Sequence, residues 1–218
     1  MRDVIRGIVI GLVVLALLGA IASRAGWLVT AIPRPGGTAP WVLARATGFT
    51  AFVALALDVI FGLLVSTRTG DRWIGRAPAI ELHGWLSPVA LALVSGHALV
   101  LLADSYIRFD LVDLAVPFAS SYRPLAVGLG VIAAYLAVVV HVSFGLRRRL
   151  GTKLWRRLHA LSFVAFVAAS VHAIAAGSDS RTPWAVALYA TPLGLVLALV
   201  VYRVARRRRP APRRPELV

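Results

Sequence analysis

The sequence contains no cysteine among its 218 residues. That absence excludes disulfides, thiolate metal sites, iron–sulfur clusters and cysteine nucleophiles. The sequence also lacks any polar stretch long enough to fold as a separate soluble domain. Hydrophobic residues make up 59% of the chain, against about 45–50% in a typical soluble domain. Together these features predict a polytopic membrane protein with one domain.

Six apolar segments have about the twenty-residue length with which a helix crosses a hydrocarbon core of about 30 Å. We place them at residues 5–23, 42–66, 82–103, 124–146, 155–176 and 184–204. The predicted fold class is therefore all-α, with a six-helix transmembrane bundle over residues 1–205. The basic, proline-rich residues 206–218 are expected to form a disordered cytoplasmic tail.

The first segment has a second interpretation. Arg2 and Arg6 precede its apolar run, and an Ala-x-Ala pattern ends it at Ala22, so it is also compatible with a cleaved signal peptide. Its apolar run is at the long end for a signal sequence, and we favour retention as a span.

Basic residues divide unevenly between the two sets of connections that six spans create. Most lie at one side, chiefly within residues 68–76, 147–157 and 203–214. The positive-inside rule therefore predicts that both termini are cytoplasmic, in a multi-pass protein of the plasma membrane. Topology and contact with anionic lipid then explain most of the formal charge of +15. The bilayer is thus an expected partner, and nucleic acid is not.

Two of the predicted spans carry two histidines each. His83 and His97 are fourteen residues apart in one, and His159 and His172 are thirteen residues apart in the other. Ionisable groups are costly in hydrocarbon and mark functional sites by default. The stretches LHGWLSPVALALVSGHA and LHALSFVAFVAASVHA align once one residue is skipped, which indicates a weak internal repeat.

Both histidine-bearing spans enter the membrane from the cytoplasmic side, so the pattern predicts two levels of paired imidazoles. His83 and His159 form an inner pair, and His97 and His172 form an outer pair roughly 20 Å away. Two imidazoles on facing helices suit the axial positions of a haem iron. Zinc is a poorer match because we expect no cysteine or carboxylate partner for these histidines. The prediction is two haem groups.

The thirteen-residue spacing poses a geometric difficulty. At 100° per residue, fourteen residues return a helix to within about 40° of its starting face, whereas thirteen leave it about 140° away. A kink, a π-bulge, or haems approached from different sides would reconcile the spacing. Pro88 should also kink the third span.

With these residues in view, the chain resembles the ferric reductase-like transmembrane domain, the membrane core of NADPH oxidases and ferric reductases. The resemblance covers roughly residues 40–205 and rests on the H-x13-H and H-x12-H spacings. The related haem subunits include the membrane partner of a periplasmic methionine sulfoxide reductase. The pieces ARATGF, DLAVPFASSYRP, LWRRLHALSF and HAIAAGSDS also look like actinobacterial stand-alone members.

The resemblance implies two b-type haems, the inner held by His83 and His159 and the outer by His97 and His172. In that family electrons pass from a cytoplasmic flavin through both haems to an acceptor outside. No sequence after residue 205 could form a flavin or nicotinamide domain. We therefore expect the donor to be a separate protein, a quinol, or a flavin bound at the inner face.

Several other polar residues lie close to the two levels. Arg45 is the first candidate for pairing with an outer haem propionate, because guanidinium binds carboxylates well. Arg156 and Arg157 are weaker candidates at the inner level, since topology already explains them. Asp58 could pair with a basic neighbour, be protonated or relay a proton. For His141 we favour a packing or hydrogen-bonding role, and a role beside the inner haem stays open.

The longest outer connection, SYIRFDLVDLAVPFASSYRP, is expected to form a short amphipathic lid on the membrane surface. Its Asp110 and Asp113 could receive a cationic substrate, although a solvated loop is the favoured interpretation.

Three functions follow from these patterns. The first is transmembrane electron transfer through two haems to an extracytoplasmic acceptor such as ferric iron, as an oxidoreductase component. The second is a haem-binding anchor that donates electrons to a periplasmic redox enzyme. The third, of another class, is a transporter or structural membrane protein whose histidines only pack, and it predicts no haem.

Overall fold

The computed structural model describes residues 38–207, so the predicted span 5–23 and residues 208–218 lie outside the described residues. The long helices are α3 (Ala39–Thr67), α4 (Arg76–Leu102), α6 (Pro124–Gly145), α7 (Arg147–Ala176) and α8 (Pro183–Arg207). A short 3₁₀ turn, η1 (Gly70–Arg72), joins α3 to α4, and the short helix α5 (Leu111–Ala115) lies between α4 and α6. All five long helices are long and apolar enough to cross a membrane. The helical, multi-pass architecture is confirmed.

Four helix ends lie three or more residues beyond the predicted spans, among them the starts of α3 at Ala39 and of α4 at Arg76. Helix α8 continues through Arg207, past the predicted domain end at residue 205. The reason is a contact between helix ends, since Arg206 Nη1 donates a hydrogen bond to the Thr67 carbonyl at 2.8 Å. Helix α7 begins eight residues before the predicted 155, but Gly151 interrupts it with a φ of 73°. Glycine adopts that left-handed conformation without steric cost, so the basic first turn is separated from the membrane-spanning part.

Backbone and threonine hydroxyl groups of the helices are hydrogen-bonded in the way that the hydrocarbon interior of a membrane requires. In hydrocarbon every backbone polar group must be satisfied internally, which an α-helix achieves. Hydroxyls within the spans do the same, since Thr47 and Thr50 donate to the carbonyls of Leu43 and Ala46 at 2.7 and 2.9 Å. Pro124 occupies the first turn of α6, where its missing N–H costs nothing.

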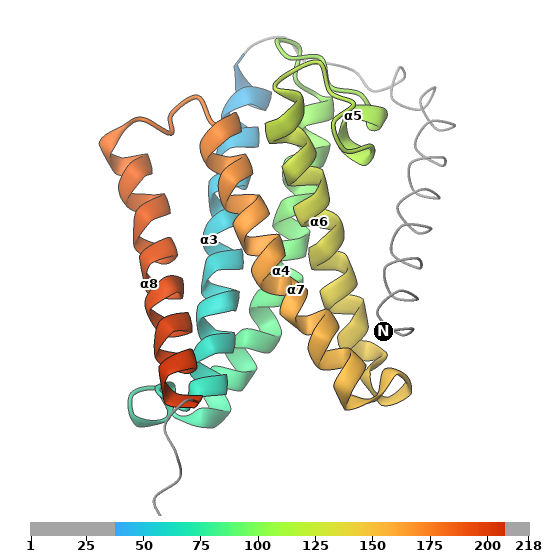
Figure 1. Cartoon of the computed structure of the whole chain (residues 1–218). Coiled ribbons are helices and arrows are strands. Elements are labelled where there is room, and N and C mark those ends of the chain that lie inside the picture. The colour runs from blue at the N-terminus through green and yellow to red at the C-terminus, as the bar shows by residue number, and fades with distance from the viewer. Residues whose placement is uncertain (1–37, 208–218) are drawn as a thin grey trace, which may run out of the picture.

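The helices are arranged as two close pairs with a looser seam between them (Figure 1). Helix α3 packs along α4, and α6 packs along α7, whereas α4 and α7 make almost no backbone contact in the described part of the chain. Helices α4 and α7 run in the same direction, opposite to α3, α6 and α8. Helix α4 remains helical on both sides of Pro88.

The tightly packed core lies on the side of α3 that faces α8. Phe52 and Leu63 of α3, Phe166 of α7 and Tyr189 of α8 are all buried there. Phe52 stacks on Phe166 with ring centroids 6.1 Å apart and meets Tyr189 edge-on at 5.1 Å. The core therefore packs α3 against α7 and α8. In the described part of the chain the buried core cluster does not extend along the seam between the two helix pairs, since none of its residues belongs to α4 or α6.

Candidate functional site

The four histidines of α4 and α7 meet across the seam in the two predicted pairs. The ring centroids of His83 and His159 are 5.9 Å apart, and those of His97 and His172 are 6.4 Å apart. In each pair the rings are steeply inclined, at 83° and 74°. The histidines of one span therefore face those of the other at two depths, although the two helices hardly touch.

The thirteen-residue spacing of His159 and His172 is accommodated by the side chains and not by the backbone of α7. No residue between His159 and His172 departs from helical geometry, so the expected kink or π-bulge in α7 is absent from that stretch. His172 instead packs against α6, where its Nδ1 lies 2.8 Å from the Ala126 carbonyl oxygen. His159 contacts the Trp155 ring, one turn earlier on α7, at 5.3 Å. Both α7 histidines face histidines of α4, and the alternative of haems approached from different sides stays a prediction.

Three of the histidines have one ring nitrogen fixed by a backbone carbonyl. His97 Nδ1 lies 2.7 Å from the Ala44 oxygen, and His83 Nδ1 lies 3.0 Å from the Asp58 carbonyl oxygen, in addition to the His172 contact. A carbonyl oxygen can only accept a hydrogen bond, so each Nδ1 carries a proton, and in the neutral ring Nε2 then keeps its lone pair. This is the tautomer and the anchoring that metal-ligating histidines require.

Glycines make room for the same three rings. A Cβ added at Gly130 of α6 would lie 2.5 Å from His172 Nδ1, and one at Gly48 or Gly62 of α3 would lie 3.1 Å from Cε1 of His97 or His83. None of these glycines was among the predicted site residues. A signal was available, because Gly48 and Gly62 are fourteen residues apart, the same spacing as the two histidines that they face.

A cavity of about 780 Å³ occupies the seam, within the range of about 300–1,000 Å³ usual for ligand sites. His97 and His172 line it, and the rest of its lining is mostly apolar and comes from α3, α4, α6 and α7. It extends inward as far as Asp58 and Ser87 and ends short of the inner histidine pair. The outer level therefore has two anchored histidines and space for a flat, apolar cofactor, while the inner level has a histidine pair in which His83 is anchored to a backbone carbonyl.

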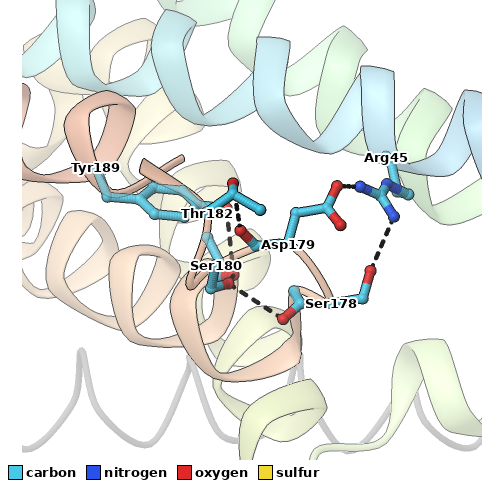
Figure 2. A network of polar contacts seen from close by, with 8 residues as sticks. Arg45, Ser178, Asp179, Ser180, Thr182 and Tyr189 are labelled. Atoms are coloured by element: carbon cyan, nitrogen blue, oxygen red, sulfur yellow. Dashed lines mark hydrogen bonds and ion pairs between the residues drawn. The ribbon is translucent and has the colours of Figure 1, made fainter. Parts of the chain in front are cut away.

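Arg45 lines this cavity at the outer level, but it already has protein partners (Figure 2). Its guanidinium forms an ion pair with Asp179 and donates to Ser178 Oγ at 2.9 Å, and it lies 4.1 Å above the Trp41 ring. Both acceptors belong to the loop between α7 and α8, which no local pattern in the sequence relates to Arg45. Because guanidinium has five N–H donors, these contacts leave donors for a further anion.

The inner level has a carboxylate, that of Asp58, and the structure shows its neighbour. Its Oδ1 lies 2.6 Å from His83 Nδ1, and its side chain is only 14% exposed. Asp58 therefore pairs with His83.

Arg156, predicted near the inner haem, is exposed on α7 and does not line the cavity.

The remaining candidate residues have structural roles. His141 Nδ1 lies 3.1 Å from Ser87 Oγ, a hydrogen bond that links α6 to α4. Asp110 caps α5 by accepting from the backbone of Val112 and Asp113, while Asp113 accepts from the backbone of Asp110. These carboxylates therefore cap the short helix α5. Leu114 of α5 also lines the cavity.

The donor set suits one kind of metal cofactor better than another. Within residues 38–207 no cluster of three or more His, Cys, Asp or Glu side chains could hold a bare metal ion. Two histidines that face each other from neighbouring helices match a cofactor that brings the remaining ligands itself, as a haem does.

Comparison with known proteins gives one family match. The family model described as ferric reductase like transmembrane component matches residues 47–170, which include three of the four histidines and stop just before His172. No curated protein and no solved structure gave a match. The matched region is more than half of the chain and contains α4, α6 and most of α3 and α7. The chain belongs to the ferric reductase-like transmembrane domain family.

Proposed function

We propose that this protein carries electrons across the cell membrane through two b-type haems. His83 and His159 would hold the inner haem, and His97 and His172 the outer. The observation that carries the proposal is the meeting of these histidines in two pairs across a seam between helices, with Nδ1 of three of them anchored to a backbone carbonyl. When bound, a haem supplies one-electron redox chemistry, and the protein supplies ligation and a low-dielectric path.

The two ends of this path define the expected partners. The donor acts at the cytoplasmic side and is a separate protein, a quinol or a flavin held at that face. The acceptor acts at the outer side, with ferric iron as the leading candidate. A hollow of about 420 Å³ in the outer connection supports an acceptor site there, because Tyr106, Ile107, Phe109 and Tyr122 line both that hollow and the cavity of the outer histidines.

The test of this proposal is a dithionite-reduced minus oxidised absorption spectrum of the purified, detergent-solubilised full chain, with haem quantified per chain. We expect two low-spin b-type haems per chain. Folded protein that contains no haem, after expression with adequate haem supply, would return the histidines to packing roles and refute the proposal.

Arg45 gives a prediction about the outer haem. Arg45→Gln should lower its reduction potential because a positive charge near the iron is lost, whereas Asp179→Asn should raise it by removing the opposing negative charge. Potentiometric titration of both variants measures the two shifts. Arg181→Gln is the matched control, since Arg181 is an exposed residue of the same loop that does not line the cavity. Unchanged potentials for both Arg45 and Asp179 variants would contradict the assignment.

A further inference from the structure

The inner and outer histidine pairs differ in what holds them, and the difference involves a buried acid. Asp58 is the one acidic residue of α3, and its carboxylate faces His83 at 2.6 Å. An acid inside a span is costly and is retained where it has a function. We propose that Asp58 acts through His83 to hold the reduction potential of the inner haem below that of the outer haem. This inference rests on the proposed function.

The outer pair has no comparable contact in the described structure. Nδ1 of His97 and of His172 faces only a neutral backbone carbonyl, of Ala44 and Ala126 respectively. His83 Nδ1 has both the Asp58 carbonyl at 3.0 Å and the Asp58 carboxylate at 2.6 Å. The same residue thus places a neutral acceptor and a carboxylate beside one histidine, whereas each Nδ1 of the outer pair faces a neutral acceptor.

The physical effect has a definite sign. The hydrogen bond of His83 Nδ1 goes to the neutral Asp58 carbonyl, and the carboxylate adds a negative charge 2.6 Å from the same nitrogen. That charge attracts the Nδ1 proton and makes the other ring nitrogen a more basic ligand. A more basic ligand stabilises the ferric state over the ferrous state, which lowers the potential of the iron that it binds. Electrons move spontaneously toward higher potential, so this asymmetry directs them from the inner level to the outer level.

Arg203 is a charge of the opposite sign at the same level. It interacts electrostatically with His159, and its positive charge favours the ferrous state of an inner haem. The contribution of Asp58 must therefore be measured with Arg203 in place. Arg203→Gln then provides a variant with the opposite expected sign, a lower inner potential.

The test is the inner haem potential of Asp58→Asn, which keeps the shape of the side chain and removes its charge. To isolate that haem, the variant is made in full-length protein carrying His97→Ala, which lacks an outer ligand. We expect a positive shift. Loss of a partner of a metal-bound histidine typically changes metal affinity about tenfold or more. If that loss falls on the ferric state alone, a tenfold change corresponds to about 59 mV for one electron.

Two further variants separate a tuning role from a structural one. Asp58→Glu retains a carboxylate and should restore most of the wild-type potential, even if Asp58→Asn weakens inner haem binding. Asp71→Asn removes the same charge from the cytoplasmic side, where Asp71 pairs with Arg76 at 3.8 Å, and should leave the potential unchanged. An electron paramagnetic resonance spectrum of the ferric inner haem should change with Asp58→Asn and not with Asp71→Asn.

The outcomes distinguish this inference from the proposed function. If wild-type protein binds two haems and Asp58→Asn shifts neither potential, or shifts both equally in otherwise wild-type protein, the role of Asp58 is refuted while electron transfer through two haems stands. If wild-type protein binds no haem, the proposed function itself fails. A positive shift confined to the inner haem and reversed by Asp58→Glu supports the inference.

Discussion

His97→Ala is expected to remove the outer haem and leave the inner haem bound, which halves the haem content per chain. His172→Ala should have the same effect, because the two residues face each other at 6.4 Å and neither contributes to the inner pair. The inner ligands lie roughly 20 Å away along the helix axis, and α3 anchors His83 independently through Asp58. Haem extraction and quantification against purified protein measure the loss.

His141→Ala is the control for this prediction. His141 is also a histidine of a spanning helix, but it bonds to Ser87 and faces no other histidine among the described residues. It should keep both haems. Loss of both haems from His97→Ala at normal protein abundance would contradict the pairing, as would an equal loss from His141→Ala.

Gly130→Ala is expected to have the second large effect, although it adds only one methyl group. That methyl would lie 2.5 Å from His172 Nδ1, so the ring must move and its hydrogen bond to the Ala126 carbonyl is disturbed. Loss of such an anchor typically weakens metal binding by about 10–100-fold. The outer haem should therefore dissociate at least about tenfold more readily, as measured by transfer of haem to an excess of an apoprotein scavenger.

Substitutions at two other glycines should cause smaller losses of the outer haem than Gly130→Ala. Gly96→Ala alters α4 next to His97, yet nothing lies within 4 Å of the added Cβ. It should retain haem and stabilise the helix, since alanine is favoured over glycine by about 1 kcal/mol in a helix interior. Gly48→Ala, at 3.1 Å from His97 Cε1, should give a smaller loss than Gly130→Ala. Equal haem retention in all three variants would show that the glycines do not position the rings.

The helices and the depth of the site were predictable from the sequence because both depend on distances along one chain. A helix needs about twenty apolar residues to cross the membrane, and the five predicted spans within residues 38–207 correspond to α3, α4, α6, α7 and α8. A rise of 1.5 Å per residue places His83 and His159 at one depth and His97 and His172 at another. The differences lie at helix ends, at the starts of α3, α4 and α7 and at the end of α8.

The chemical surroundings of the histidines were decided by the tertiary structure. Asp58 is 25 residues from His83 in the sequence, and Arg45 is more than a hundred residues from Asp179, so no local pattern relates either pair. A thirteen-residue spacing by itself places His159 and His172 on different faces of α7. The direction in which each of these rings points therefore also depended on the residues around it. The sequence by itself determined how deep each histidine lies, since backbone rise is fixed. Packing between helices alone decided what each histidine faces, since that depends on how the helices rotate and approach one another.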